Sequence, residues 1–275
     1  SPAMKRLSLP LMTAVGLMGM TALTGCGSGS TDSATSASAA MTPSASSTPS
    51  PSSTLSGTVT VLAAASLTES FTALEKSFEA ANPGVDVTIS FGSSATLAQQ
   101  IAQGAPADLY ASAGTKALDQ LPAEAKAKPT TTLAKNVLEI ATPPGNPKKV
   151  TGLASLADAS TNVVLCAETV PCGSAADAVL TKAGVTAHVV SREVDVKATL
   201  AKITLGEADA AIVYHSDVVA AGSKVEGVEI PAAQNTTLAY PLVRLTDTAA
   251  TKAFADLLAS AAGLKELEAV GFLAP

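Results

Sequence analysis

Four short segments rich in small and hydroxyl residues each follow an apolar run and precede a helical pattern. They lie at positions 63–66, 91–96, 170–174 and 193–196. Small side chains leave backbone N–H groups accessible, and the first turn of a helix carries unpaired N–H donors and about half a positive charge. Four such turns, if they converge, carry about +2 together. The segments therefore indicate a binding site for a small dianion that needs no basic side chain.

Each segment also has a purely structural interpretation. Serine and aspartate at a helix start usually cap that helix, and Ser66 with Glu69 matches the S-x-x-E capping box. Ser93, Ser94 and Asp195 suit the same capping role. No single segment is therefore evidence for a ligand, and the anion site depends on whether the segments meet.

The elements that must position these segments read as strands alternating with helices. The helix expected over 67–80 has apolar residues spaced for one face, at Leu67, Phe71, Leu74 and Phe78, so it should cover a sheet. This alternation predicts an α/β fold with largely parallel sheets. Strands are expected at 58–64, 85–91, 108–111, 136–142, 162–167, 188–191, 210–214 and 238–244.

The first 25 residues are typical of a leader rather than of a fold. Ser1 to Ala3 precede Met4 as a cloning remnant, a basic pair follows, and the apolar run over 7–23 is too short for the roughly 20 residues of a membrane span. The run ends in Leu-Thr-Gly-Cys, which resembles the lipobox of bacterial lipoproteins. The resemblance implies removal of 1–25 and lipidation of Cys26.

Residues 26–56 predict a disordered tether behind the lipidated cysteine. The stretch is almost wholly Ser, Thr, Ala, Gly and Pro, with Asp32 as its one charge. It has too few large apolar groups to offset the entropy lost on ordering. We expect an extracytoplasmic protein that is held by lipid at the outer face of the cell membrane.

The composition sets limits on fold and partners. With 275 residues, 47% of them hydrophobic, the chain can bury a sizeable core. Aromatic residues make up 3%, Trp is absent, and loss of Lys5 and Arg6 with the leader would take the net charge from -6 to -8. Nucleic-acid binding by bulk charge is therefore excluded.

Once Cys26 carries lipid, Cys166 and Cys172 are the two thiols that remain. An oxidising compartment favours a disulfide that closes a small loop between them. Metal ligation is the alternative, but only His188 and His215 could complete a site, and neither stands at ligand spacing.

Several motifs together resemble the molybdate-binding proteins of molybdate ABC importers. AAASLT at 63–68, FGSSATLAQQI at 91–101 and GAPADLYASA at 104–113 follow one another in order. Further matches are VPCG at 170–173, EVDVK at 193–197, AIVYHSD at 211–217 and YPL at 240–242. The likeness covers nearly all of 57–275.

The resemblance implies a two-lobed, periplasmic-binding-protein-like fold of type II with the ligand cleft between the lobes. Residues 57–139 and 238–275 would form lobe 1, and 140–237 lobe 2. The oxyanion would be held by the Ser66 and Ser94 hydroxyls, by backbone N–H groups that include those of Cys172 and Val196, and by the Tyr214 phenol. These residues would contact the oxygens of the anion and not the metal atom directly.

The same resemblance implies that the protein binds molybdate, and tungstate because of its similar size, and delivers it to an ABC transporter permease. It would be a monomer without cofactor, enzymatic activity or nucleic-acid partner. Arg192 and Lys197, the cations nearest to a motif, are expected to be solvated surface charges.

Three alternatives stay open. The chain could be a receptor for another tetrahedral oxyanion such as sulfate, or a structural lipoprotein without a small ligand. A secreted serine hydrolase is disfavoured because there is no G-x-S-x-G motif, and the adjacent His215, Ser216 and Asp217 cannot converge into a triad.

Overall fold

Nine strands form a mixed sheet in the computed structural model, which describes residues 54–275. The leader, Cys26 and the predicted tether up to residue 53 lie outside the described residues. The strand order is β2-β1-β3-β9-β4-β7-β5-β6, and β8 also pairs with β4. None of the helices within 54–275 combines the length and the apolar character that a membrane span requires.

Two groups of parallel strands lie on either side of β4 in the strand order. In the first, β1 (Ser56–Ala64) pairs with β2 (Gly84–Gly92) and with β3 (Leu109–Ala111). The second group comprises β5 (Val163–Cys166), which pairs with β6 (Val189–Glu193) and with β7 (Ala210–Tyr214).

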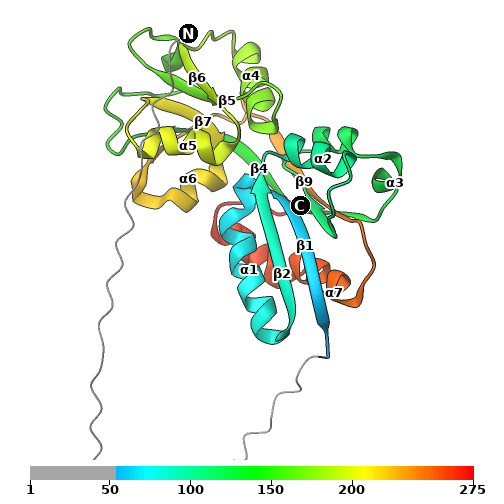
Figure 1. Cartoon of the computed structure of the whole chain (residues 1–275). Helices are drawn as coiled ribbons and strands as arrows, with labels where there is room; N and C mark the ends of the chain where they lie inside the picture. The colour runs from blue at the N-terminus through cyan, green and yellow to red at the C-terminus, as the bar shows by residue number, and fades with distance from the viewer. Residues whose placement is uncertain (1–53) are drawn as a thin grey trace, which may run out of the picture. The chain divides into compact units, whose positions relative to one another are not determined.

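The long strand β4 (Thr130–Thr142) connects the two groups. Its residues up to Val137 pair with β9 (Thr237–Arg244), which is itself antiparallel to β3. From Leu138 onward β4 pairs with β7 and with β8 (Glu226–Glu229). Figure 1 shows β5, β6 and β7 toward one end of β4, and β1 and β2 toward the other. This change of partner lies close to the predicted boundary at 139/140, while the two-lobe division stays a prediction.

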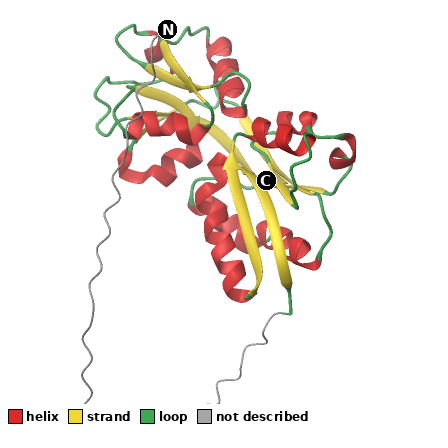
Figure 2. Cartoon of the chain, viewed as in Figure 1, coloured by secondary structure: helices red, strands yellow, loops and turns green. Residues whose placement is uncertain are grey.

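Helices lie on both sides of the strands (Figure 2). The α1 helix buries Phe71, Leu74 and Phe78 as its spacing predicts, and the Phe78 ring lies 5.0 Å from that of Phe254. Each such side chain contributes about 1.5–3 kcal/mol by leaving water. The helices are α1 (Thr68–Ala81), α2 (Ser94–Ala102), α3 (Ala123–Lys126), α4 (Pro171–Ala183), α5 (Val196–Thr204), α6 (His215–Ala221), α7 (Ala249–Leu258) and α8 (Ala261–Ala269). Short 3₁₀ helices lie at η1 (Ala65–Leu67), η2 (Lys116–Gln120), η3 (Leu153–Ala157) and η4 (Gly222–Lys224).

The prediction of an α/β fold is confirmed, and all eight predicted strands are present, seven of them with shifted ends and β7 with the ends predicted. The expectation of largely parallel sheets is wrong, because β4 and β9 make antiparallel ladders that account for half of the strand pairings within 54–275. Sequence patterns also missed β8, whose residues are mostly exposed, and the start of β4, where Thr130 to Thr132 face solvent. Neither stretch carries the apolar alternation that marks a half-buried strand.

Candidate functional site

The carboxyl ends of the parallel strands bring the predicted segments together. Ala64 pairs with Gly92 across β1 and β2, so the segments that follow these two strands leave the sheet side by side. Cys166 pairs with Glu193 across β5 and β6, which does the same for the other two segments. Because the carboxyl ends of parallel strands share one edge, each strand pair presents two helix starts. The four segments meet at one cavity.

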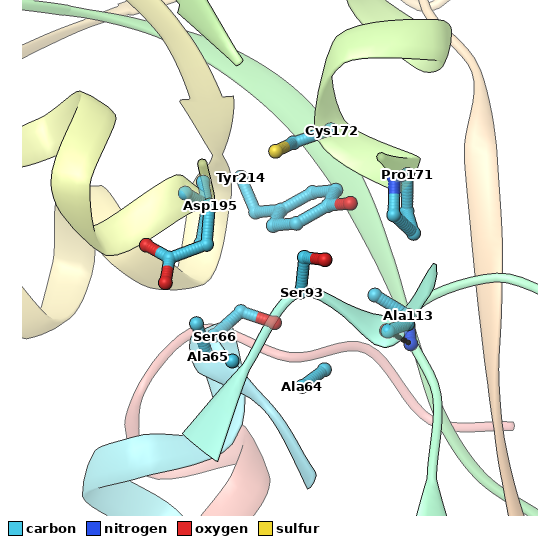
Figure 3. Close-up of a pocket in the computed structure, with 12 residues that line it drawn as sticks. Ala64, Ala65, Ser66, Ser93, Ala113, Pro171, Cys172, Asp195 and Tyr214 are labelled. Atoms are coloured by element: carbon cyan, nitrogen blue, oxygen red, sulfur yellow. Dashed lines mark hydrogen bonds between the residues drawn. The ribbon is translucent and has the colours of Figure 1, made fainter. Parts of the chain in front are cut away.

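The cavity is small, with a volume of about 10 Å³. A space of this size is at the limit for one water molecule, so any larger guest requires the cavity to widen. Figure 3 shows the Tyr214 ring reaching between Cys172 and Ser93. The lining residues are Ala64, Ala65, Ser66, Gly92, Ser93, Ser94, Ala113, Pro171, Cys172, Asp195, Val196 and Tyr214.

Helix starts supply the electropositive character of the cavity. The α2 helix begins at Ser94, α4 at Pro171 and α5 at Val196, and all three residues line it. The first four N–H groups of a helix have no partner within the helix, and they face the side where an anion is stabilised. No lysine or arginine of residues 54–275 lines the cavity. The arrangement therefore suits an anion that is held by neutral donors.

Ser93 and Ser94 divide two roles between them. Ser93 caps α2, since its Oγ accepts from Thr96 N at 3.1 Å and donates to Thr96 Oγ1 at 2.8 Å. Ser94 Oγ accepts from Ala113 N at 2.9 Å, which leaves its hydrogen to donate to a guest. The expectation that Ser94 caps a helix is wrong, because the backbone turn places it one position inside α2.

Ser66 does not form the predicted capping box with Glu69. A 3₁₀ turn over Ala65–Leu67 precedes α1, so Ser66 lies inside a helical turn and Leu67 takes the capping position. The Ser66 hydroxyl instead forms a 2.8 Å hydrogen bond with the Tyr240 hydroxyl. Ser66 therefore does not cap α1, and it lines the cavity.

Tyr214 carries a polar group that the protein leaves without a partner. Its side chain is fully buried, and its hydroxyl has no hydrogen-bond partner within residues 54–275. A buried donor without a partner costs about 1–3 kcal/mol. Burial also raises the pKa of the phenol well above its ordinary value of 10.0, so the group stays protonated and can donate. A guest anion would provide the acceptor that this hydroxyl lacks.

Lys197 lies outside the cavity lining but is not the solvated charge expected from the sequence. Its Nζ lies 2.8 Å from Glu69 Oε1 and 3.3 Å from Oδ1 of the fully buried Asp217. The other Asp217 oxygen, Oδ2, accepts from Tyr214 N at 3.0 Å. Burial raises the pKa of Asp217 to about 6, and the positive charge of Lys197 lowers it. The ion pairs thus brace the segment that carries Tyr214.

Arg192 also makes structural contacts. It donates to both carboxylate oxygens of Asp177, at 2.8 and 3.1 Å, and to the Cys166 carbonyl at 3.0 Å. Like Lys197, it does not line the cavity. These positions agree with the expectation that neither Arg192 nor Lys197 contacts the ligand. Both side chains are paired with carboxylates, however, and are not simply solvated.

Cys166 and Cys172 form a disulfide that ties the end of β5 to the first turn of α4. The chain is tightly packed here, because a Cβ on Gly173 would lie 1.8 Å from the Ala167 carbonyl oxygen. This loop carries the Cys172 backbone to the cavity edge. Residues 54–275 contain no cluster of three or more His, Cys, Asp or Glu side chains that could hold a metal ion.

A second, larger cavity of about 530 Å³ lies beside β4 and the segment before β9. The Glu139 carboxylate and the His215 ring pair at its wall, and Glu229 adds another carboxylate. These two carboxylates repel an anion, whereas the one carboxylate at the small cavity, that of Asp195, caps α5 by accepting from Ala198 N, so the small cavity is the better anion site. His188 is held near the Thr161 carbonyl, and neither histidine lines the small cavity.

Known proteins share both sequence and fold with the chain. The family model of bacterial extracellular solute-binding proteins matches residues 59–273. The molybdate-binding protein ModA of Mycobacterium tuberculosis is 38% identical over 222 residues, which span 79% of this chain and 85% of that protein.

Two solved structures extend the comparison. The substrate-binding domain of a putative molybdenum ABC transporter from Clostridium difficile has a TM-score of 0.59 at 31% identity, covering 79% of this chain and 99% of that one. The sulfate-binding protein SubI of Mycobacterium tuberculosis has a TM-score of 0.68 at 20% identity, covering 78% and 86%. The second likeness shows the fold alone.

Proposed function

The chain belongs to the bacterial extracellular solute-binding proteins, and from this premise we propose that it binds molybdate in the small cavity and delivers it to an ABC importer. The observation that carries the proposal is the buried, unpartnered hydroxyl of Tyr214 in a cavity formed by helix starts. Apart from the Asp195 carboxylate, which caps α5 by accepting from Ala198 N, the polar side chains that line the cavity are hydroxyls that can donate. The relatives named for molybdate indicate which anion the donors receive.

The proposed contacts are the Ser66 and Ser94 hydroxyls, the backbone N–H groups of Cys172 and Val196, and the Tyr214 phenol. Neutral donors can replace the hydration of a dianion on enclosure. Because no lysine or arginine of residues 54–275 lines the cavity, no ion pair with such a side chain opposes release to a permease. Tungstate should bind with similar affinity because its size is similar.

The proposal includes the cellular setting. The protein would act outside the cytoplasmic membrane, anchored through lipid on Cys26, as a monomer without cofactor. It would not be an enzyme, since the serines at the cavity have no histidine beside them to act as a base. Substitution Cys26→Ala should shift the protein from the membrane fraction to the medium. If the variant stays with the membrane, the anchor proposal is wrong.

A receptor for another tetrahedral oxyanion is the second candidate, because the fold is shared with a sulfate-binding protein. Calorimetric titration of the purified protein with molybdate, tungstate, sulfate and hydrogen phosphate separates the two. We expect molybdate and tungstate to bind within about tenfold of each other, and sulfate to bind at least about 1.4 kcal/mol, or tenfold, more weakly. Sulfate binding that equals or exceeds molybdate binding would refute molybdate as the ligand.

The site residues are tested separately by Ser66→Ala, with Ser77→Ala as the matched control. Ser77 Oγ donates to the Leu74 carbonyl within α1 and does not line the cavity. Loss of a hydrogen bond to a charged guest should weaken molybdate binding in Ser66→Ala by about 1.5–3 kcal/mol, and Ser77→Ala should bind as the wild type. Equal affinities in both variants would remove Ser66 from the site.

A further inference from the structure

A chain of buried polar side chains lies behind Ser66 and does not itself line the cavity. Ser66 Oγ is bonded to Tyr240 Oη at 2.8 Å, and Asn136 Nδ2 donates to Tyr240 Oη at 3.3 Å. Asn136 Nδ2 also donates to Ser216 Oγ at 2.8 Å. All four side chains belong to residues that are at most 3% exposed. Such a network is strongly favoured only when every donor finds an acceptor.

The orientation of the Asn136 amide determines the direction of these hydrogen bonds. Its Oδ1 accepts from Val137 N at 3.1 Å, so the NH₂ group is the one that faces Tyr240 and Ser216. An NH₂ group has two hydrogens to donate and accepts none. Tyr240 Oη therefore accepts from Asn136. The only other partner of Tyr240 Oη within residues 54–275 is Ser66 Oγ, so the Tyr240 hydrogen points to Ser66.

The direction of these hydrogen bonds determines which atom Ser66 presents to the cavity. Its oxygen accepts the hydrogen of Tyr240, and its own hydrogen is left to point at a guest. An oxyanion oxygen without a proton accepts this hydrogen. A guest that carries an O–H at this position meets the Ser66 hydrogen, whereas the remaining Ser66 lone pair is not directed at it.

We propose that Asn136 and Tyr240 are positioning residues that force Ser66 to act as a donor, and that they thereby select fully deprotonated oxyanions over protonated ones such as hydrogen phosphate. This inference rests on the proposed function. Asn136 lies on β4, two residues before Leu138, where β4 exchanges β9 for β7. It contacts Tyr240 of β9 on one side and Ser216 of α6 on the other. The same amide therefore links Ser66, through Tyr240, to the segment that follows Tyr214.

The hydrogen bonds that run from Asn136 through Tyr240 to Ser66 are called the relay here. Two substitutions disturb it in different ways. Asn136→Asp replaces the NH₂ donor with an acceptor, so Tyr240 donates to residue 136, Ser66 donates to Tyr240, and Ser66 presents a lone pair to the guest. Tyr240→Phe removes the relay without a change of charge, and the ring keeps its edge-on packing against Tyr214 and Phe272. Asn162→Asp introduces the same charge at an exposed position and serves as the control.

The experiment measures the affinities of molybdate and of inorganic phosphate by calorimetric titration near pH 7 for the wild type and all three variants. Melting curves first establish that each variant is folded. We expect the ratio of molybdate to phosphate affinity to fall at least tenfold in Asn136→Asp, to fall by a smaller factor in Tyr240→Phe, and to stay unchanged in Asn162→Asp. A merely structural role would weaken both anions alike and leave the ratio unchanged.

An unchanged ratio in Asn136→Asp and Tyr240→Phe overturns the relay while leaving molybdate binding in place. A ratio that falls in Asn136→Asp alone also overturns it, because the new charge then acts directly on the guest. If Asn136→Asp does not fold, Tyr240→Phe decides by itself. Failure of the wild type to bind molybdate is a separate result, which refutes the proposed function.

Discussion

Replacing Tyr214 with phenylalanine separates guest binding from the stability of the protein itself. The Tyr214 hydroxyl has no hydrogen-bond partner within residues 54–275, so its removal leaves no other protein group unpaired. The ring would keep its edge-on contact with Tyr240, whose centroid lies 6.1 Å away. Because the unpaired buried hydroxyl costs about 1–3 kcal/mol, we expect its removal to raise the unfolding free energy without guest by up to that amount.

Guest binding should respond strongly to the same change. A hydrogen bond to a charged group contributes about 1.5–3 kcal/mol. At about 1.4 kcal/mol per factor of ten, the affinity for molybdate should fall about 10- to 150-fold. A large loss of affinity together with a gain of stability is specific to a hydroxyl that finds its partner only in the guest.

The assay pairs calorimetric titration with denaturant unfolding of the guest-free protein. Tyr110→Phe is the contrasting variant, because the Tyr110 hydroxyl donates to the Ser94 carbonyl at 2.6 Å. That variant should lose about 1–3 kcal/mol of unfolding free energy without any guest. The reasoning is refuted if Tyr214→Phe binds molybdate like the wild type, or if it is destabilised as much as Tyr110→Phe.

Three further predictions concern the surroundings of the cavity. Ser94→Ala should weaken molybdate binding by about 1–3 kcal/mol, whereas Ser93→Ala should leave the affinity nearly unchanged and lower the unfolding free energy by about 0.5–2 kcal/mol through loss of a helix cap. Titration of both variants checks this division, and weaker binding in Ser93→Ala alone would reverse the two roles. Replacing Cys166 and Cys172 together with alanine should lower the unfolding free energy by about 2 kcal/mol, as expected for a short closed loop. Denaturant unfolding measures this loss, and an unchanged midpoint would contradict the prediction. The pKa of Asp217 is raised to about 6 from its ordinary value of 3.8. Between about pH 4 and 6 the folded state therefore binds a proton at Asp217 that the unfolded state has lost, so the unfolding free energy falls as the pH rises through this range. Relative to the wild type, Asp217→Asn should gain stability over that range in unfolding measured at several pH values, and a constant difference would show that Asp217 does not titrate there.

The sequence was a good guide to the secondary structure where burial leaves a periodic signal. The face of α1 with Phe71, Leu74 and Phe78 is buried as its spacing predicts, and the eight predicted strands are present. The signal fails at β8 and at the start of β4, where the residues are exposed and no pattern of apolar side chains remains. None of the family motifs lies in these two stretches.

The predicted capping box shows what a motif of neighbouring residues cannot predict. Ser66 and Glu69 match a capping box, yet Ser66 bonds to Tyr240 and Glu69 pairs with Lys197. A local motif describes which hydrogen bonds are possible within one turn. It does not show that a partner from a distant strand or helix is better placed.

From residue types and order alone, the chain can be assigned an α/β fold and a set of helix starts suited to an anion, because both depend on interactions within a few residues. Whether these starts meet around one cavity depends on strand register, such as the pairing of Ala64 with Gly92. The direction in which Ser66 donates depends on Tyr240, 174 residues away. Such choices are made by packing and by the pairing of buried polar groups, and these exist only once the distant segments are in contact.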